Sequence, residues 1–170
     1  QYMTDSEIAA DVVWNMGLLG DIGKVSVDLG AGTGILGIGM ALMGSEKVYL
    51  VEQDRQALQI AKENALSLES EDKIKVVHDS IANFNEKVDC VLMNPPFGTK
   101  SEGADKRFLE KAFGLADVVW SFHKTSTKDF IKSYCEGQGF RIDREYEYKF
   151  PIKKTMEHHK KARELIDVSV

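Results

Sequence analysis

The sequence predicts an α/β fold with a largely parallel sheet, and three observations support that prediction. Apolar runs typical of buried strands alternate with amphipathic helical stretches along the chain. A cluster of glycines joins the first of these runs to the helix that follows it. Polar side chains come directly after four successive runs, which is where open α/β sheets place their ligands. We therefore expect right-handed crossovers and helices on both faces of the sheet.

The expected elements follow from hydrophobic spacing. An opening helix at 5–16 carries Ile8, Val12 and Val13 at helical intervals, with Thr4 as its predicted N-cap and Glu7 as the capping-box partner. Strands are expected at 24–29, 47–52, 73–78 and 88–93, separated by helices near 35–43 and 54–68. The second half adds a helix near 104–117, a strand at 117–122, a helix at 127–136, and strands near 139–150 and 164–170.

Composition narrows the class of protein. The chain has 170 residues and is 43% hydrophobic, which suits one globular domain with a sizeable core. No apolar run approaches the roughly 18 residues of a membrane span, so we expect a cytoplasmic chain without a membrane partner. Cys90 and Cys135 are too distant in sequence for a metal motif and are predicted to be buried or free thiols. Apolar patterning predicts that Trp14, Trp120 and Tyr134 pack in the interior.

Basic residues are concentrated late in the chain. Residues 1–122 hold 11 Lys or Arg against 19 Asp or Glu, whereas residues 123–163 hold 11 against 6. The late segment is either an ordinary solvated face or a patch that meets phosphates. The phosphate-contact candidates are Lys100, His123, Lys124, Lys128, Lys132, Lys153, Lys154, His158, His159, Lys160 and Lys161. The adjacent histidines lack a third ligand at suitable spacing, so no metal site is expected.

The first motif is a glycine loop between the first strand and its helix. Gly30, Gly32 and Gly34 let the backbone turn sharply and lie against a ligand without an intervening Cβ. The segment 32–37 also fits the dinucleotide pattern G-x-G-x-x-G, although that match is weak. Asp28 places a carboxylate beside the loop, which favours a cationic or amine-bearing ligand over a pyrophosphate.

Two acidic residues follow the second and third strands. Glu52 stands at a strand end, where a carboxylate can accept both hydroxyls of a ribose, and Asp54 is predicted to cap the next helix. Asp79 could accept a hydrogen bond from an adenine amine while the amides of Ser80 and Ile81 meet ring nitrogens. An Asx turn at Asp79 is the alternative.

The fourth strand ends in Asn94-Pro95-Pro96-Phe97. Proline lacks a backbone donor and fixes φ, so the strand must stop there. An amide, two rigid residues and an aromatic ring suit catalysis on a planar, amino-bearing substrate. The alternative is a strand-terminating turn with Phe97 in the core. The order of the four motifs at successive strand ends is more specific than any one of them.

With these motifs the sequence resembles the S-adenosylmethionine (SAM)-dependent methyltransferases, and among them the amino-methylating group with (Asp/Asn/Ser)-Pro-Pro-(Tyr/Phe/Trp). It is similar to the methyltransferase-like ribosomal-RNA adenine-N6 methyltransferases of archaea and eukaryotes in Gln1-Tyr2-x-Thr4, the segment 94–100, Asp105 with Phe108-Leu109, and Ser121-x-His123-Lys124-x-Ser126-Thr127. The resemblance implies a Rossmann-like class I fold with a seven-stranded mixed sheet in the order 3-2-1-4-5-7-6. It also implies one methyltransferase domain over 1–170, trimmed at both ends relative to the family.

The resemblance also implies roles. Asp28, Gly30, Gly32 and Gly34 would hold the methionine part of SAM, Glu52 its ribose, and Asp79, Ser80 and Ile81 its adenine, with Gln1, Tyr2, Thr4 and Asn94 completing the cofactor site. Asn94 and Pro95 would accept the hydrogens of the target amine, Pro96 would keep the motif rigid, and Phe97 would stack on the base. Lys100, His123, Lys124, Lys153 and Lys154 would contact the RNA. A small zinc-binding activator protein would pair with the outer strand at 73–78.

Other functions remain open on the sequence. The same fold could methylate a protein glutamine amide or guanine N2, although Phe97 and the His123-Lys124 segment favour adenine. A non-catalytic SAM-binding module and a nicotinamide-dependent dehydrogenase are more distant alternatives.

Overall fold

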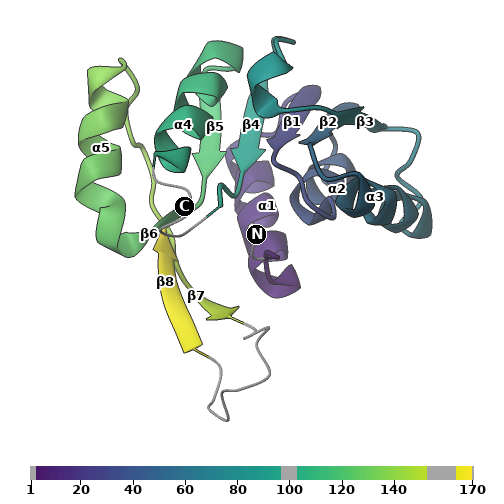
Figure 1. Cartoon of the computed structure of the whole chain (residues 1–170), viewed down its shortest axis with the longest axis horizontal. Coiled ribbons are helices and arrows are strands. Elements are labelled where there is room, and N and C mark those ends of the chain that lie inside the picture. Colours follow the sequence, from purple (N-terminus) through teal and green to yellow (C-terminus); the bar gives the residue numbers. More distant parts are fainter. Residues whose placement is uncertain (1–2, 97–102, 153–163, 170) are drawn as a thin grey trace.

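The main sheet is parallel and has five strands in the order β3-β2-β1-β4-β5 (Figure 1). The structure is a computed structural model that describes residues 3–96, 103–152 and 164–169. The strands are β1 (Val25–Leu29), β2 (Lys47–Glu52), β3 (Ile74–His78), β4 (Cys90–Met93) and β5 (Val118–Ser121). In the register, Ser26 of the central strand lies beside Val48 of β2 and Cys90 of β4. All five carboxyl ends therefore meet at one edge of the sheet.

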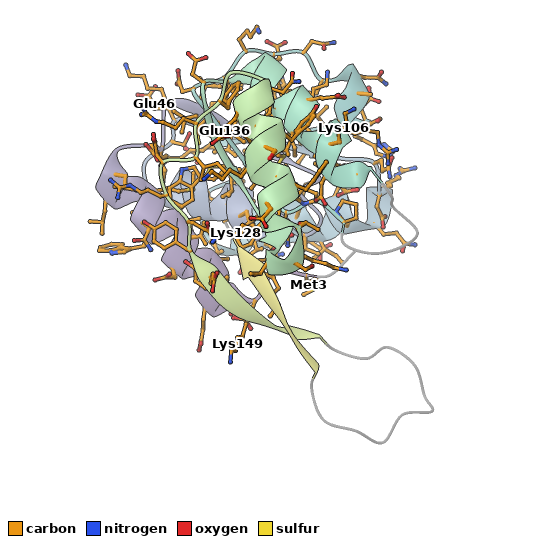
Figure 2. All side chains as sticks on the ribbon, turned by 90° about the vertical axis from the view of Figure 1, so that its left-hand side faces the viewer. Met3, Glu46, Lys106, Lys128, Glu136 and Lys149 are labelled. Carbon is orange, nitrogen blue, oxygen red and sulfur yellow. The ribbon has the colours of Figure 1, made fainter. Side chains whose placement is uncertain are left out.

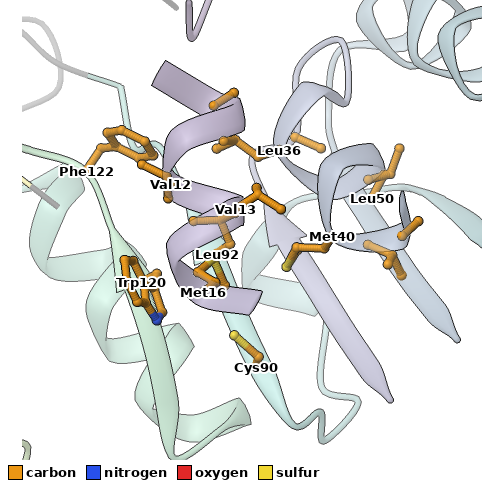
Figure 3. Packing of buried hydrophobic residues seen from close by; sticks show 14 of the residues in the cluster. Val12, Val13, Met16, Leu36, Met40, Leu50, Cys90, Leu92, Trp120 and Phe122 are labelled. Carbon is orange, nitrogen blue, oxygen red and sulfur yellow. The ribbon is translucent and has the colours of Figure 1, made fainter. Parts of the chain in front are cut away.

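Helices cover both faces of this sheet and form two separate cores. The helices are α1 (Ser6–Leu19), α2 (Ile35–Leu42), α3 (Arg55–Ser67), α4 (Ala104–Leu115) and α5 (Lys128–Gly137), with short 3₁₀ turns η1 (Ile81–Asn83) and η3 (Thr125–Thr127). On one face, α1 and α2 pack together over β2, β4 and β5 through side chains such as Val12, Met40 and Leu92 (Figure 3). On the other face, α4 and α5 pack on Val91 and Met93. Alternation along each strand supplies both cores, as the sequence pattern predicts.

A second, antiparallel sheet follows the main one. It contains β6 (His123–Lys124), β8 (Glu164–Ser169) and β7 (Glu147–Ile152), in the order β6-β8-β7. β7 and β8 extend away from the body of the molecule (Figures 1 and 2). The predicted order of the first five strands is confirmed, but the described residues form sheets of five and three strands where one sheet of seven was expected.

The junction of the two sheets lies at Phe122, which is fully buried. Its backbone N–H donates to the carbonyl of Met93 at 3.0 Å, and its ring meets Phe150 of β7 edge to face, with centroids 5.6 Å apart. The predicted strand at 139–150 begins only at Glu147. The reason is local: residues 141–145 are nearly all charged and lack an apolar side to bury, and Arg141 instead pairs with Asp143 at 2.5 Å.

Several local predictions need correction. Asp5, not Thr4, caps α1 by accepting from the amides of Glu7 and Ile8. Trp14 was predicted to pack, but it is 56% exposed on α1. Trp120 is buried as predicted and donates its indole N–H to Asp21 at 2.9 Å. Among the described helices, none combines the length and apolar character that crossing a bilayer requires.

Candidate functional site

The glycine loop closes over the end of β2. The amides of Gly30 and Ala31 both donate to the carbonyl of Val51, at 2.9 and 3.0 Å, which turns the chain at the end of β1. Gly30, Gly32 and Gly34 all have positive φ (73°, 55° and 85°), a conformation that residues with a Cβ rarely adopt. The sequence prediction of a tight, glycine-dependent turn is thus confirmed. At Gly32 the backbone borders open space, since a Cβ placed there would meet nothing within 4 Å.

Asp28 lies beneath this loop and is only 1% exposed. One of its carboxylate oxygens accepts from the amide of Gly37 at 2.8 Å. Burial raises the pKa of Asp28 to about 7, an effect that the Gly37 hydrogen bond opposes and the nearby charge of Glu52 reinforces. A cation placed beside this carboxyl would favour its charged form.

The carboxylate of Glu52 is held by hydrogen bonds from three backbone amides. Its Oε1 accepts from the amides of Gln53 and Asp54, at 2.9 and 3.0 Å, and its Oε2 accepts from Gly32 at 2.9 Å. The side chain is 6% exposed, so its position is set before any ligand binds. Asp54 also caps α3, as predicted, by accepting from Gln56 at 2.8 Å.

Asp79 has an immediate local role at the end of β3. Its Oδ1 accepts from the Asn83 side-chain amide and from the Ser80 backbone, each at 2.7 Å. The Asn83 and Ser80 hydrogen bonds hold the pKa of Asp79 below its usual range. Neither bond comes from the backbone amide of Ile81, which an Asx turn at Asp79 would use, and Ser80 caps η1 beside it.

A pocket of about 820 Å³ brings these strand ends together. Its volume falls in the range of small-molecule and cofactor sites. The sequence-predicted residues that line it are Gly30, Glu52, Asp79, Ser80, Ile81 and Pro96. Asp28 and Asn94 are almost completely buried and are not among the lining residues.

Lys111, which also lines this pocket, is a residue that sequence reasoning missed. Its ammonium group donates to the carbonyls of Ala82 and Phe84, at 2.9 and 3.0 Å, and to the side chain of Asn85 at 3.1 Å. It thereby ties α4 to the segment around η1. A lysine on an amphipathic helix is expected to point into solvent, so nothing in the sequence predicts this contact.

Asn94 is the best-defined polar group at the end of β4. Its side-chain amide donates to Thr4 Oγ1 at 2.9 Å, and the residue is 5% exposed. This bond sets the amide orientation and leaves Oδ1 buried, with no hydrogen-bond partner among the described residues. Thr4 is also buried, which explains why its hydroxyl does not cap α1.

Several predicted site residues lie outside the described residues: Gln1, Tyr2, Phe97, Lys100, Lys153 and Lys154. Lys124 is half-buried beside η3, where its carbonyl accepts from Thr127 at 2.8 Å. Within the described ranges, no three His, Cys, Asp or Glu side chains are grouped as a metal site would require.

The placement of His123 differs from the predicted phosphate contact. The residue is 5% exposed, and its Nδ1 lies 2.9 Å from a carboxylate oxygen of Asp105 in the first turn of α4. A histidine beside a lysine looks like part of a basic surface in sequence. The alternation along β5 and β6 instead turns its ring inward, toward α4.

Comparison with known proteins agrees with this arrangement of fold and site. Residues 15–116 match the methyltransferase small domain family, which is more than half of the chain. The chain belongs to that family. It is therefore a methyltransferase, and SAM is its cofactor.

Relatives that match over nearly the whole chain define its branch of the family. The rRNA N(6)-adenosine-methyltransferase METTL5 of Danio rerio is 33% identical, with 100% of this chain and 84% of the relative covered. Mettl5 of Drosophila melanogaster, which has the same descriptive name, is 36% identical over 99% of this chain and 83% of its own length. A Pyrococcus horikoshii crystal structure, described as that of a candidate RNA methyltransferase, is 40% identical with a TM-score of 0.88, covering 99% of this chain and 84% of that one.

Proposed function

We propose that this chain transfers the methyl group of SAM to the N6 amine of an adenosine in ribosomal RNA. The observation that carries the proposal is Asn94, whose Oδ1 is a buried, preoriented acceptor without a partner among the described residues. An unsatisfied buried acceptor is costly and therefore rare in folded proteins. An amine with hydrogens to donate satisfies it. The names of the METTL5 relatives supply the substrate class.

The residues present fit SAM. The glycine loop offers backbone that can lie against a ligand, and Glu52 is held with its carboxylate at the pocket wall. In this proposal Asp28, Gly30, Gly32 and Gly34 hold the methionine part, Glu52 accepts the ribose hydroxyls, and Asp79, Ser80 and Ile81 meet the adenine. Gln1, Tyr2, Thr4 and Asn94 complete the enclosure. When bound, SAM supplies a methyl group activated by its sulfonium.

The chain itself prepares the nucleophile. The lone pair of an adenine amine is delocalised into the ring, which makes the nitrogen a poor nucleophile. By accepting the two amine hydrogens, Asn94 Oδ1 and the Pro95 carbonyl draw the nitrogen toward tetrahedral geometry and release the lone pair. Pro95 and Pro96 keep these acceptors in place with little loss of backbone entropy. Alignment of the amine with the methyl group then contributes much of the rate. The nitrogen must lose one of its protons as it is methylated, and no strong base is needed because methylation makes that proton acidic enough to pass to solvent.

Binding of the RNA is assigned to basic side chains around this edge. Phe97 stacks on the extruded base, and Lys100, Lys124, Lys153 and Lys154 meet phosphates in the proposal. Lys124 is the member of this group within the described residues, and it ends β6, which Phe122 separates from β5. The buried ring of His123 is not assigned to phosphate binding.

The outer edge of β3 is the proposed docking site for a small zinc-binding activator protein. Among the described strands, β3 pairs only with β2, and most of its residues are partly or fully exposed. An unpaired strand edge is a template for β-augmentation by a partner. We further assign β7 and β8 to the sixth and seventh strands of one sheet in the order 3-2-1-4-5-7-6, joined through β6. The whole chain is assigned to one domain that works in the cytoplasm.

A nucleoside-resolved methylation assay tests the function. The chain is incubated with SAM labelled in its methyl group and with ribosomal RNA, with and without the activator, and the RNA is then digested to nucleosides. Label in N6-methyladenosine is the expected result. Label in methylguanosine, or in a protein glutamine, would overturn the choice of adenine while leaving the methyltransferase class intact.

A further inference from the structure

Three buried side-chain atoms near the ends of β4 and β5 have no hydrogen-bond partner among the described residues, and the proposed function uses only the first. They are Oδ1 of Asn94, Oγ of Ser121 and Nε2 of His123. In Asn94 and His123 the other polar atom of the side chain is already bonded. Asn94 donates to Thr4, and Nδ1 of His123 lies 2.9 Å from Asp105. Both side chains are thus held in a fixed orientation with one group left to pair.

Asn94 follows β4 directly, and His123 begins β6 just beyond β5. Met93 pairs with Ser121 in the parallel register, and the amide of Phe122 donates to the carbonyl of Met93. The two side chains leave opposite faces of the sheet, because Asn94 reaches Thr4 ahead of α1 whereas His123 reaches Asp105 of α4. Neighbouring strands are about 4.8 Å apart, so a nucleotide that lies across this edge can bring its amine to Asn94 and its sugar to His123.

The bond to Asp105 determines what His123 can recognise. A carboxylate is an acceptor, so the imidazole nitrogen that faces it carries the hydrogen, and Nε2 of the neutral ring is left as an acceptor. Adenosine within an RNA strand has donors at its amine and at its 2′-hydroxyl. In the proposed reaction Asn94 and Pro95 take both amine hydrogens. The 2′-hydroxyl is the donor that remains.

We propose that His123, oriented by Asp105, accepts a hydrogen bond from the ribose 2′-hydroxyl of the target adenosine and so selects RNA over DNA. This inference rests on the proposed function and extends it. Nε2 of His123 is covered in the chain without substrate, but Oδ1 of Asn94 is covered to the same extent. A base that reaches Asn94 has to open the same edge of the sheet.

The test measures whether the effect of removing the 2′-hydroxyl from the target adenosine depends on the presence of His123. An RNA fragment containing the adenosine identified by the nucleoside assay is made in three forms, with a 2′-hydroxyl, a 2′-hydrogen or a 2′-fluorine at that nucleotide. Fluorine keeps a ribose-like sugar pucker but cannot donate. The unaltered chain is expected to work about tenfold more slowly on both modified RNAs, the value of roughly one hydrogen bond.

His123→Ala is expected to lose about the same tenfold on the unmodified RNA and to show no further loss on the modified ones. A 2′-hydrogen at the next nucleotide serves as the matched control, with the same effect on both proteins. SAM affinity, measured by calorimetry, reports whether the variant is folded.

Equal losses from the 2′ modifications in the two proteins would overturn the inference. Equal rates of the unaltered chain on all three RNAs would overturn it without any variant. In both cases the unaltered chain still methylates the unmodified RNA, so the proposed function stands. Absence of methylated adenosine from that reaction would instead overturn the proposed function and this inference together.

Discussion

The ends of β1 and β2 and the ends of β4 and β5 use buried polar side chains in opposite ways. At β1 and β2, Asp28 and Glu52 are bonded to backbone amides of their own chain. At β4 and β5, Asn94 and His123 each keep one buried atom unpaired within the described residues. The buried carboxylates at the ends of β1 and β2 are hydrogen-bonded before a ligand binds. The unpaired atoms at the ends of β4 and β5 can form their hydrogen bonds with a ligand. In the proposed function the first, rigid half of the site (β1 and β2) holds the cofactor and the second, unsatisfied half (β4 and β5) binds the substrate, and this contrast suits a transferase, because only the second half has to discriminate among partners.

The largest expected effect concerns the protonation of Asp28 in the absence of cofactor. Its pKa is raised from 3.8 to about 7, so the folded chain holds this proton more tightly than the unfolded chain does. The resulting stability is fully present below pH 4 and is lost as the pH rises through 7, a change of about 4 kcal/mol. Asp28→Asn cannot ionise and keeps an acceptor for Gly37, so it should lack this loss.

Urea unfolding of both proteins between pH 4.5 and 8 measures the difference. The free energies of unfolding should diverge steadily toward acid in favour of the unaltered chain. Parallel pH profiles would show that Asp28 is not the group that titrates.

Asn94→Ala tests the unsatisfied half. Removal of an acceptor that acts in the transition state should lower turnover by about 10² to 10³, because such preoriented groups contribute that much in comparable sites. SAM affinity should change by less than about tenfold, since Asp28, Glu52 and the glycine loop, which make most of the proposed cofactor contacts, are untouched. The paired measurements are methyl transfer to ribosomal RNA and calorimetry with SAM.

Thr4→Val is the companion variant for Asn94. It keeps the shape of the side chain but removes the hydroxyl that orients the amide, so its turnover should fall between those of the unaltered chain and Asn94→Ala. Full activity in both variants would contradict the role assigned to Oδ1.

Gly37→Ala tests how tightly the rigid half is packed. A Cβ at this position would lie 2.2 Å from Leu50 Cδ2 and 3.1 Å from Asp28 Cβ, so the variant should be less stable by about 1 to 3 kcal/mol. Gly114→Ala is the matched control, because a Cβ there meets nothing within 4 Å and the residue lies in α4. Alanine is the better helix former, so that control should gain roughly 0.5 to 1 kcal/mol. Equal effects of the two changes on urea unfolding would contradict the close packing at Gly37.

Glu52→Gln should have the smallest effect. The amide oxygen can still accept from Gln53 and Asp54, but the NH2 group cannot accept from Gly32, and the charge that strengthens the proposed bonds to the ribose is lost, so the Kd for SAM should rise about tenfold. Asp54→Ala, which removes the cap of α3, should cost about 1 kcal/mol of stability without changing that Kd. Calorimetry and urea unfolding on both variants separate ligand binding from stability, and an unchanged Kd in Glu52→Gln would remove Glu52 from the cofactor site.

The sequence predicted most of the main sheet, because its signals are local. Buried strands such as 47–52 and 90–93 are apolar runs, and a glycine cluster at a strand end is typical of a tight strand-to-helix turn. The alternation of strands and helices implies a parallel sheet by general rules, whereas the strand order came from the resemblance to the SAM-dependent methyltransferases. The pocket-lining positions Glu52 and Pro96 were found for the same reason, since strand ends can be read from where the apolar runs stop.

The side-chain placements that the sequence did not predict depend on contacts between residues that are distant in the chain. Thr4 and Asp5 are both suitable caps, and Asn94, far along the chain, takes the hydroxyl of Thr4. His123 appears basic beside Lys124 until Asp105 is seen next to it. Trp14 has a large apolar side chain of the kind that usually packs in a core, yet it lies on the exposed side of α1. In each of these three cases the local sequence supports one prediction, and the packing of residues distant in the chain produces a different result.

Phe122 gives the molecule a natural boundary for protein engineering. Its backbone is bonded to β4, its ring contacts Phe150, and β6 begins at the next residue. A recombinant chimera that exchanges the β7–β8 segment with a relative has to carry a matching aromatic pair across this point. If the pair is mismatched, the disturbance would reach Met93 and the adjacent Asn94, even though every exchanged residue lies beyond the main sheet.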